Sequence, residues 1–336
     1  MTTQTAIAQP ARARSLVQSD AVRKLLAFAG LIALILFFSW RAPEVFPTWL
    51  NTKGVLLATA VNGVLALGVT FVIITSGIDL SVGTTMTFAA VMTAQFIVIW
   101  GWPMWIGVFG GMLAGALAGT INGFVIAKMK IPPFIATLGM LYATKGFALI
   151  ISELKPIYFT ETPAFQKIAM GSVTGAIYPA FDFPNAVLIF FGAAIVANLI
   201  LQRTVLGRYT FALGSNEEAT RLSGVNTDNW KIAVYALCGM FAGMAGVLMA
   251  SRLNSAQPAL GAGYELDAIA AVVIGGTALS GGEGSILGTV IGAFIISVLT
   301  NGLRILKVPQ EWQMVITGAI VVLAVFADIA RRRRSN

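Results

Sequence analysis

Long apolar runs separated by short polar breaks form the main pattern of this sequence. A helix needs about 20 apolar residues to cross about 30 Å of hydrocarbon. The breaks divide the chain into about ten runs of this kind, near residues 25–40, 55–76, 81–100, 104–127, 132–152, 186–202, 232–250, 266–281, 286–303 and 312–330. The pattern therefore predicts an all-α polytopic membrane protein with about ten transmembrane helices.

The composition supports this prediction and excludes several kinds of chemistry. Of the 336 residues, 57% are hydrophobic and only 11% are charged, which is unlike a water-soluble protein. The chain has no histidine, and its one cysteine, Cys238, lies inside an apolar run. Imidazole catalysis, the common zinc sites and a disulfide framework are therefore excluded, and we expect neither an enzyme nor a metal site.

The basic residues indicate how the chain is oriented. The net charge is +8, but the Lys and Arg residues lie in small groups beside apolar runs and form no face for nucleic acid. If the N-terminus is cytoplasmic, the inner segments hold about twice as many of them as the outer segments, which favours cytoplasmic placement of both termini. We predict a cytoplasmic tail at 1–24, one transmembrane domain at 25–330 with a cytoplasmic loop at 203–231, and a basic cytoplasmic tail at 331–336.

Two short motifs recur in the same order in the two halves of the chain. The pattern N-G-x-x-I-x-K occurs at 122–128 and 301–307, and GIDLS at 77–81 has a counterpart in GYELD at 263–267. In the predicted topology, the first copy of each motif lies at the cytoplasmic side and the second at the outer side. This arrangement predicts an inverted repeat of spans 2–5 and 7–10 with the substrate path between the repeats.

Polar residues in these motifs lie next to predicted span ends. Short polar side chains at such positions bond the free backbone groups of helix ends or bond neighbouring helices. We expect capping or helix-breaking roles, rather than contact with substrate, for Asp79, Ser81, Asn122, Glu265, Asp267 and Asn301.

A polar stripe marks one face of the fifth predicted span. Thr137, Thr144 and Lys145 are spaced i, i+7 and i+8 and therefore share a helical face, which could line a hydrated path. Gln313 and Thr317 form the counterpart in the tenth span. The alternative for Lys145 is that its long side chain reaches the membrane surface by snorkelling.

The segment 214–226 predicts a short polar helix between two spans. Ser215 followed by Glu218 matches a capping box, and Gly224 supplies the glycine that ends a helix. A helix of about two turns is not stable alone in water, so it needs a docking surface on this chain or on a partner. The alternative is a simple connector. The predicted docking residues are Ser215, Glu217, Glu218, Ala219, Arg221, Leu222 and Gly224.

No motif in the chain accounts for an energy source. The phosphate-binding pattern G-x-x-x-x-G-K-[ST] is absent, and the glycine-rich run 275–284 lacks its lysine. We expect this run to form a tight turn between closely packed spans 8 and 9. Energy for transport must then come from another subunit or from an ion gradient.

Three stretches resemble the ribose-type sugar permeases of bacterial ABC importers: GSNEEATRLSGVN, TSGIDLSVG and GYELDAIAAVVIGGTALSGGEGS. The resemblance extends from about residue 50 to 328. The segment 218–224 also resembles the E-A-A-x-x-x-G loop of ABC importers, with Thr220 replacing the second alanine.

The resemblance implies a permease subunit of the bacterial inner membrane that carries a monosaccharide, such as a ribose-like pentose, a hexose or a related polyol. It implies that the docking helix sits in a cleft of a cytoplasmic ATP-binding subunit, which uses ATP and Mg while this chain binds no cofactor. It further implies two partners: a second permease copy, which would form a homodimer with this chain, and a periplasmic sugar-binding protein.

Two other classes of protein compete with this interpretation. An ion-coupled secondary transporter would be expected to place carboxylates in mid-span, whereas Asp79, Glu265, Asp267 and Glu283 fall near predicted span ends. A membrane enzyme would need histidine or paired carboxylates in a span. We therefore predict an ABC importer permease, with the ion-coupled transporter as the alternative and the identity of the sugar left open.

Overall fold

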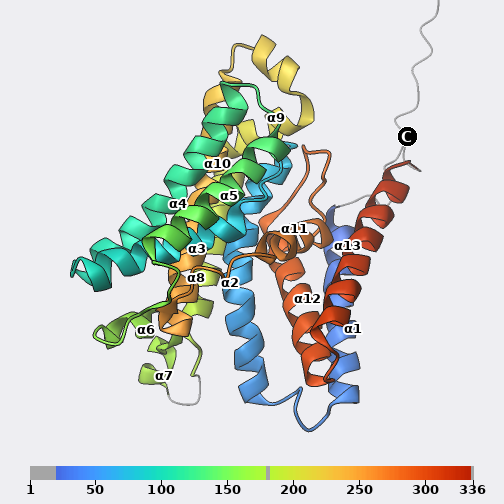
Figure 1. Cartoon of the computed structure of the whole chain (residues 1–336). Helices are drawn as coiled ribbons and strands as arrows, with labels where there is room; N and C mark the ends of the chain where they lie inside the picture. Colours follow the sequence, from blue (N-terminus) through green and yellow to red (C-terminus); the bar gives the residue numbers. More distant parts are fainter. Residues whose placement is uncertain (1–19, 179–181, 334–336) are drawn as a thin grey trace, which may run out of the picture.

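The computed structural model describes residues 20–178 and 182–333, so most of the predicted N-terminal tail and half of the predicted C-terminal tail lie outside the described residues. Helices make up most of this part (Figure 1). They are α1 (Asp20–Arg41), α2 (Trp49–Ile74), α3 (Val82–Ala94), the π-helical turn η2 (Gln95–Ile99), α4 (Met104–Ala127), α5 (Pro133–Ile151), α6 (Pro163–Met170), α7 (Val173–Ile177), α8 (Asn185–Arg203), α9 (Val205–Leu222), α10 (Thr227–Leu253), α11 (Tyr264–Ile274), α12 (Ile286–Ile305) and α13 (Gln310–Arg333). Two short strands, β1 (Ile157–Tyr158) and β2 (Ser255–Ala256), pair antiparallel.

Seven of the described helices are long and apolar enough to cross a membrane. They are α2, α3 with η2, α4, α5, α8, α10 and α12. In α1 the apolar stretch is shorter, Leu25–Arg41. The prediction of an all-α polytopic membrane protein is confirmed, whereas the number of ten crossings stays a prediction.

The predicted span at 266–281 is wrong in length. Its helix, α11, has 11 residues and ends at Ile274. At 1.5 Å per residue it extends about 16 Å, roughly half of the hydrocarbon thickness. The helix ends there because Gly276 has a left-handed φ of 91° and turns the chain into a glycine-rich loop. In Figure 1, α11 lies at about half the height of the long helices, between α2 and α12.

Close contact between α4 and α10 forms the centre of the larger bundle. Gly115 lies against the carbonyl of Gly239, and Gly119 lies against the carbonyl of Tyr235. A side chain at either α4 glycine would overlap the backbone of α10. The small residues spaced by four along α4 thus form packing faces, because they let two helix backbones approach closely.

The two predicted repeats pack on each other reciprocally. Helix α10 packs on α3 and α4, while α2 packs on α11 and α12. The first helix of each repeat therefore contacts the second and third helices of the other, which an inverted repeat predicts. At the α2–α12 contact, the Thr70 and Thr289 hydroxyls are 2.7 Å apart.

The two copies of the N-G-x-x-I-x-K motif lie at opposite ends of the molecule, whereas the two copies of the other motif do not. Asn122 bonds Ser81, in the turn that follows the C-terminus of α2, whereas Gly302 lies against Phe38 near the end of α1. The second motif departs from the prediction, since Gly83 at the start of α3 touches Gly261 and Glu265 at the start of α11. The two copies meet because α11 is too short to carry its start to the outer surface.

A small subdomain follows α5, and no sequence pattern predicted it. It comprises β1, α6 and α7. The Ser251 hydroxyl of α10 fixes this subdomain by donating to the Phe165 carbonyl at 2.7 Å and accepting from the Ala169 amide at 2.9 Å. The rings of Phe159 and Phe165 stack with centroids 3.9 Å apart.

Candidate docking and substrate sites

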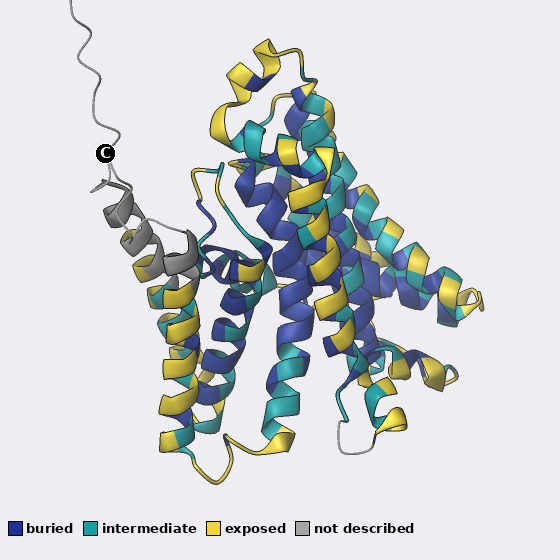
Figure 2. Ribbon diagram, turned by 180° about the vertical axis from the view of Figure 1, so that it is seen from behind, coloured by how far each residue is buried: buried dark blue, intermediate teal, exposed yellow. Residues whose placement is uncertain are grey.

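A short helix lies at 217–222, where the sequence predicts one, and projects from one end of the molecule; we call it the docking helix after its predicted role. Helix α9 kinks at Asn216, whose φ of −163° and ψ of 101° are not helical, and this separates residues 217–222 from the rest of α9. Gly224 has a left-handed φ of 85°, and open space surrounds it. Leu222 is 80% exposed. This part of the chain lies beyond the ends of the long helices and is largely exposed (Figures 1 and 2).

The cap of the docking helix differs from the predicted one. The Asn216 side chain, and not Ser215, accepts the bond from the Ala219 amide, at 2.9 Å. Glu218 does not return to the cap but pairs with Arg221 at 3.2 Å. Asparagine is as good a cap as serine, so the adjacent Ser215 and Asn216 were equally valid choices from sequence. Asn216 was thus missed although its signal was present.

The docking helix is attached to α10 along one flank. Glu217 bonds Lys231 at 2.6 Å, so Glu217 is not the free flank that its sequence position suggests. Thr220 is buried, and its hydroxyl donates to the Asn216 carbonyl at 2.8 Å. Ala219 and Leu222 are exposed. The face opposite Lys231 is therefore available for a partner.

A second polar region surrounds the start of α3. Asp79 is buried, and its carboxylate accepts bonds from the Ser81 amide at 2.9 Å and the Ser81 hydroxyl at 2.6 Å. Burial raises the pKa of the Asp79 carboxyl above its ordinary value. Ser81 occupies the cap position but makes no side-chain cap bond, because its hydroxyl is directed to Asp79. Asn122 of α4 extends this series of hydrogen bonds by donating to the Ser81 hydroxyl at 3.0 Å.

The acidic residues of the second motif belong to the start of α11. The Gly263 amide donates to the Glu265 carboxylate at 3.0 and 3.1 Å, and Asp267 lies in the first helical turn. Negative charge is favourable at a helix N-terminus. Asn301 lies on α12, and its side-chain oxygen is buried without a hydrogen-bond partner among the described residues. Among the described residues, the Asn301 side-chain oxygen thus accepts no interhelical hydrogen bond.

Asp79, Glu265 and Asp267 lie at helix ends, as predicted, but those helix ends lie inside the bundle. Asp79 is only 2% exposed, and Glu265 touches Gly83. Their positions along the chain therefore do not argue against ion coupling, and that step of the sequence argument is wrong. The reason is again that α3 and α11 begin within the bundle and not at its surface.

The predicted pathway stripe on α5 divides between two environments. Thr137 and Thr144 are buried, and the Thr144 hydroxyl donates to Thr84 of α3 at 2.8 Å. Lys145 is exposed and lines a cavity of about 10 Å³ with Thr84 and Thr87 and with Pro258, Ala259, Gly261 and Ala262. Thr144 thus joins α5 to α3, Thr137 bonds only the backbone of its own helix, and Lys145 borders a small cavity.

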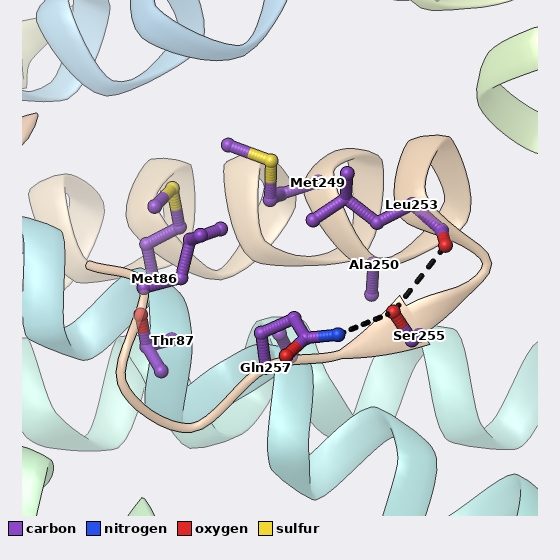
Figure 3. A pocket seen from close by; sticks show the side chains of 9 residues that line it. Met86, Thr87, Met249, Ala250, Leu253, Ser255 and Gln257 are labelled. Carbon is purple, nitrogen blue, oxygen red and sulfur yellow. Dashed lines mark hydrogen bonds between the residues drawn. The ribbon is translucent and has the colours of Figure 1, made fainter. Parts of the chain in front are cut away.

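A second cavity of about 10 Å³ also borders the segment 254–263, which connects α10 to α11. Met86 and Thr87 of α3 line it together with Met249 and the segment Ser255–Gln257 (Figure 3). Gln257 donates to the Ser255 hydroxyl at 3.0 Å, which is directed to the Leu253 carbonyl at 3.3 Å. Each cavity has room for about one water molecule and is too small for a monosaccharide.

The counterpart stripe on α13 lies apart from α5. Gln313 donates to the Val308 carbonyl at 2.7 Å, and Thr317 is half-buried. Figure 1 places α13 and α5 on opposite sides of the molecule. The structure of a single chain therefore does not bring the two predicted stripes together.

Neither a metal site nor a phosphate loop is formed by the described residues. Within 20–178 and 182–333, no group of three or more His, Cys, Asp or Glu side chains could hold a metal ion. The glycine-rich run forms the predicted tight turn, with Gly275 against the Gly288 backbone and left-handed φ values at Gly281 and Gly282.

Comparison with known proteins agrees with these features. The family model described as "Branched-chain amino acid transport system / permease component" matches residues 51–325. The chain is 41% identical to the ribose import permease protein RbsC of Escherichia coli (strain K12), over 91% of this chain and 92% of that protein. It is 41% identical to RbsC of Bacillus subtilis (strain 168), over 91% and 93% of the two chains.

A third relative carries a different pentose. The chain is 35% identical to the xylose transport system permease protein XylH of E. coli (strain K12), over 91% of this chain and 92% of that protein. No solved structure gives a significant match. The chain is thus a multi-pass membrane protein, and it belongs to the family of permease components that the matching model describes, with sugar permeases among its relatives.

Proposed function

We propose that this chain is the transmembrane permease subunit of an ABC importer, forming the path for a monosaccharide such as a ribose-like pentose, a hexose or a related polyol. The observation that carries the proposal is the similarity to ribose and xylose permeases over 91% of the chain. The same similarity favours an importer over the ion-coupled alternative. The chain is a conduit and has no catalytic residue.

A separate cytoplasmic ATP-binding subunit supplies the energy, using ATP and Mg that this chain does not bind. The docking helix is its contact. Its support is geometric, because residues 217–224 project from the bundle and Ala219, Leu222 and Gly224 are exposed. Glu217 attaches the helix to α10 through Lys231, while Glu218 and Arg221 pair with each other within the helix.

We place the substrate path between two copies of the chain, a proposed homodimer, and not between the two repeats of one copy as the sequence pattern predicted. Two features support a shared path: the cavities at Lys145 and Ser255 are too small for a sugar, and α5 and α13 are far apart within one copy. Thr137, Thr144, Lys145, Gln313 and Thr317 are the candidate lining residues. A periplasmic binding protein delivers the sugar.

Both termini lie in the cytoplasm of a bacterium, and the protein is placed in the inner membrane. The basic residues favour this orientation. Tryptophan is enriched at membrane surfaces. The helix ends that we assign to the outer surface carry Trp40, Trp49, Trp100, Trp102, Trp105 and Trp312. A reporter fused after Arg221 should be cytoplasmic and one fused after Phe165 periplasmic, and the opposite result at both sites would invert the orientation.

Transport in reconstituted membranes tests the proposal directly. The permease alone should neither hydrolyse ATP nor take up D-ribose or D-xylose. Together with the ATPase and the binding protein, it should take up at least one monosaccharide in an ATP-dependent manner. Uptake that persists without ATP and collapses with an ionophore would contradict the proposal and favour ion coupling.

A further inference from the structure

Three segments that are distant in sequence meet beside the docking helix. They are the end of α2 at 74–76, the end of the first part of α9 at 214–215, and the glycine-rich loop between α11 and α12 at 278–282. The Gly282 amide donates to the Ile74 carbonyl at 2.9 Å, and Gly214 lies against the same carbonyl. We name this contact the Ser76 junction.

The Ser76 hydroxyl joins the three segments. It is 2.8 Å from the Ser280 carbonyl and 3.4 Å from the Gly214 carbonyl, so one hydroxyl is shared between two backbone acceptors. The backbone of Ser76 is left-handed, with φ of 61°, which directs the side chain away from α2 and toward the other two segments. Serine seldom adopts this conformation without a local reason, and the two bonds supply one.

The backbones in the junction are too close for side chains. A Cβ atom on Gly214 would overlap the Ile74 carbonyl, and one on Gly281 would overlap the Ser76 hydroxyl. Ser76 itself is exposed, but backbones in such close contact cannot shift toward one another, so a displacement of one segment moves the others.

The junction lies between the docking helix and the centre of the membrane domain. The docking helix begins two residues after Ser215, beyond the kink at Asn216. On the other side, Ser76 leads through Ile78, whose carbonyl accepts a bond from Tyr235 at 3.2 Å, to the start of α3. The loop at 278–282 continues from α11, and the starts of α3 and α11 touch at Gly83 and Gly261.

We infer that the Ser76 junction transmits movement of the docking helix to the starts of α3 and α11, which meet at the buried Gly83 and Gly261, with Ser76 as the residue that positions the three segments. This inference rests on the proposed function, because it takes the ATPase as the source of the movement. Ser76 differs from a local capping residue because its hydroxyl bonds the carbonyls of two other segments, those of Gly214 and Ser280. A contiguous contact alone does not establish coupling, so the inference requires a measurement of coupling.

The variant Ser76→Gly isolates the hydroxyl. Glycine adopts a left-handed φ without strain, so the backbone of the turn is kept while both bonds are lost. In the reconstituted complex with the ATPase and the binding protein, co-purification of the ATPase and the rate of ATP hydrolysis should stay at the wild-type values. The number of sugar molecules taken up per ATP should fall about fivefold or more.

The matched control is Thr120→Ala. This change also removes one hydroxyl, but that hydroxyl donates to the Ala116 carbonyl of its own helix, at 2.7 Å. Sugar taken up per ATP should equal the wild-type value. A purely structural role for Ser76 would lower the amount of folded complex and leave the ratio of sugar to ATP unchanged.

A labelling experiment reads the movement itself. In a Cys238→Ser background, cysteine is placed at Ala262, which is exposed beside the start of α11 and borders the Lys145 cavity. Trapping the ATPase with ATP and vanadate should change the labelling rate by a small hydrophilic thiol reagent. With Ser76→Gly added, trapping should leave that rate unchanged.

The outcomes separate this inference from the proposed function. If the wild-type complex transports and Ser76→Gly keeps both the wild-type ratio of sugar to ATP and the trapping-dependent labelling, the inference is wrong and the proposed function stands. If the wild-type complex takes up no monosaccharide with ATP, the proposed function fails and the inference fails with it. Loss of ATPase binding in Ser76→Gly would also overturn the inference, since it would place Ser76 in docking.

Discussion

The contact between α4 and α10 and the docking helix at 217–222 are built in opposite ways. In the first, glycine backbones lie against each other, and Tyr235 and Gly239 are buried. In the second, a short helix is held by one asparagine cap and by ion pairs at its surface, with Leu222 80% exposed.

The difference separates stability from recognition. Closely packed backbone in α4 and α10 leaves no room for change, so substitutions there should act on folding. The docking helix contributes little buried surface to its own chain, so substitutions there should act on partner binding. Exposed residues on a loop that a rigid scaffold positions are typical of binding sites.

The largest effect is expected for Gly119→Leu. The added side chain would overlap the Tyr235 carbonyl and force α4 and α10 apart, which typically costs about 1–3 kcal/mol or more. Folded protein, measured by size-exclusion chromatography in detergent, should fall sharply. Gly192→Leu on α8, where open space surrounds the glycine, is the control and should fold normally. Equal yields of the two variants would break the comparison.

Gly224→Val should remove ATPase binding and leave folding intact. Valine at a φ of 85° is strained by about 1–3 kcal/mol, and the side chain would enter the open face of the docking helix. Ala219→Trp should act alike. Co-purification with the ATPase measures the effect, and Gly30→Val, at an open position on α1, is the control. If both docking variants retain the ATPase and transport normally, residues 217–222 are only a connector.

Lys145→Met would sharpen the comparison, because Lys145 belongs to the membrane domain but is exposed. If the side chain lines the path, uptake should fall several-fold, while folded protein and ATPase binding stay normal. Cysteine at Lys145, in a Cys238→Ser background, should react with a hydrophilic thiol reagent more slowly when sugar is present, whereas cysteine at the buried Thr144 should react little. Normal uptake in Lys145→Met would favour snorkelling.

Asn216→Ala should have a moderate effect. Loss of an N-cap costs about 1 kcal/mol, which is a large share of the stability of so short a helix. Co-purification with the ATPase should weaken several-fold. Ser215→Ala should weaken it less, because Ser215 does not bond the Ala219 amide. If Ser215→Ala weakens co-purification more than Asn216→Ala does, Ser215 and not Asn216 is the cap.

Asp182→Asn should have the smallest effect. The hydrogen bond from Lys53 lowers the pKa of Asp182 below its ordinary value of 3.8. A lowered pKa in the folded state means that the stabilisation is present above the unfolded-state value and is lost as the pH falls through the folded-state value. The thermal stability of wild type and variant should therefore differ slightly at neutral pH and converge in acid below that value. A difference that grows in acid would contradict the ion pair.

The sequence predicted the helices well where period and length were decisive. The spans near 55–76, 104–127 and 232–250 match α2, α4 and α10 within a few residues. It failed at α11, because an apolar run does not reveal where Gly275 and Gly276 will stop a helix. It also missed Ser76, because a hydroxyl that bridges two distant backbone segments leaves no local sequence pattern. It predicted Ser215 as the helix cap in place of Asn216, because serine and asparagine have equal capping propensity.

The brevity of α11 has a consequence for how the protein is made. An 11-residue helix cannot span the bilayer when it leaves the ribosome, and the polar backbone at its ends would be unsatisfied in lipid. Its resting place is the backbone of α12, where Gly288 and Gly292 lie against Gly275 and Ala271. Helix α2, which is made earlier, supplies only part of the packing of α11. Synthesis of α12 therefore completes that packing, and a nascent chain that ends before Gly288 should leave residues 264–274 more accessible to protease than the full chain does.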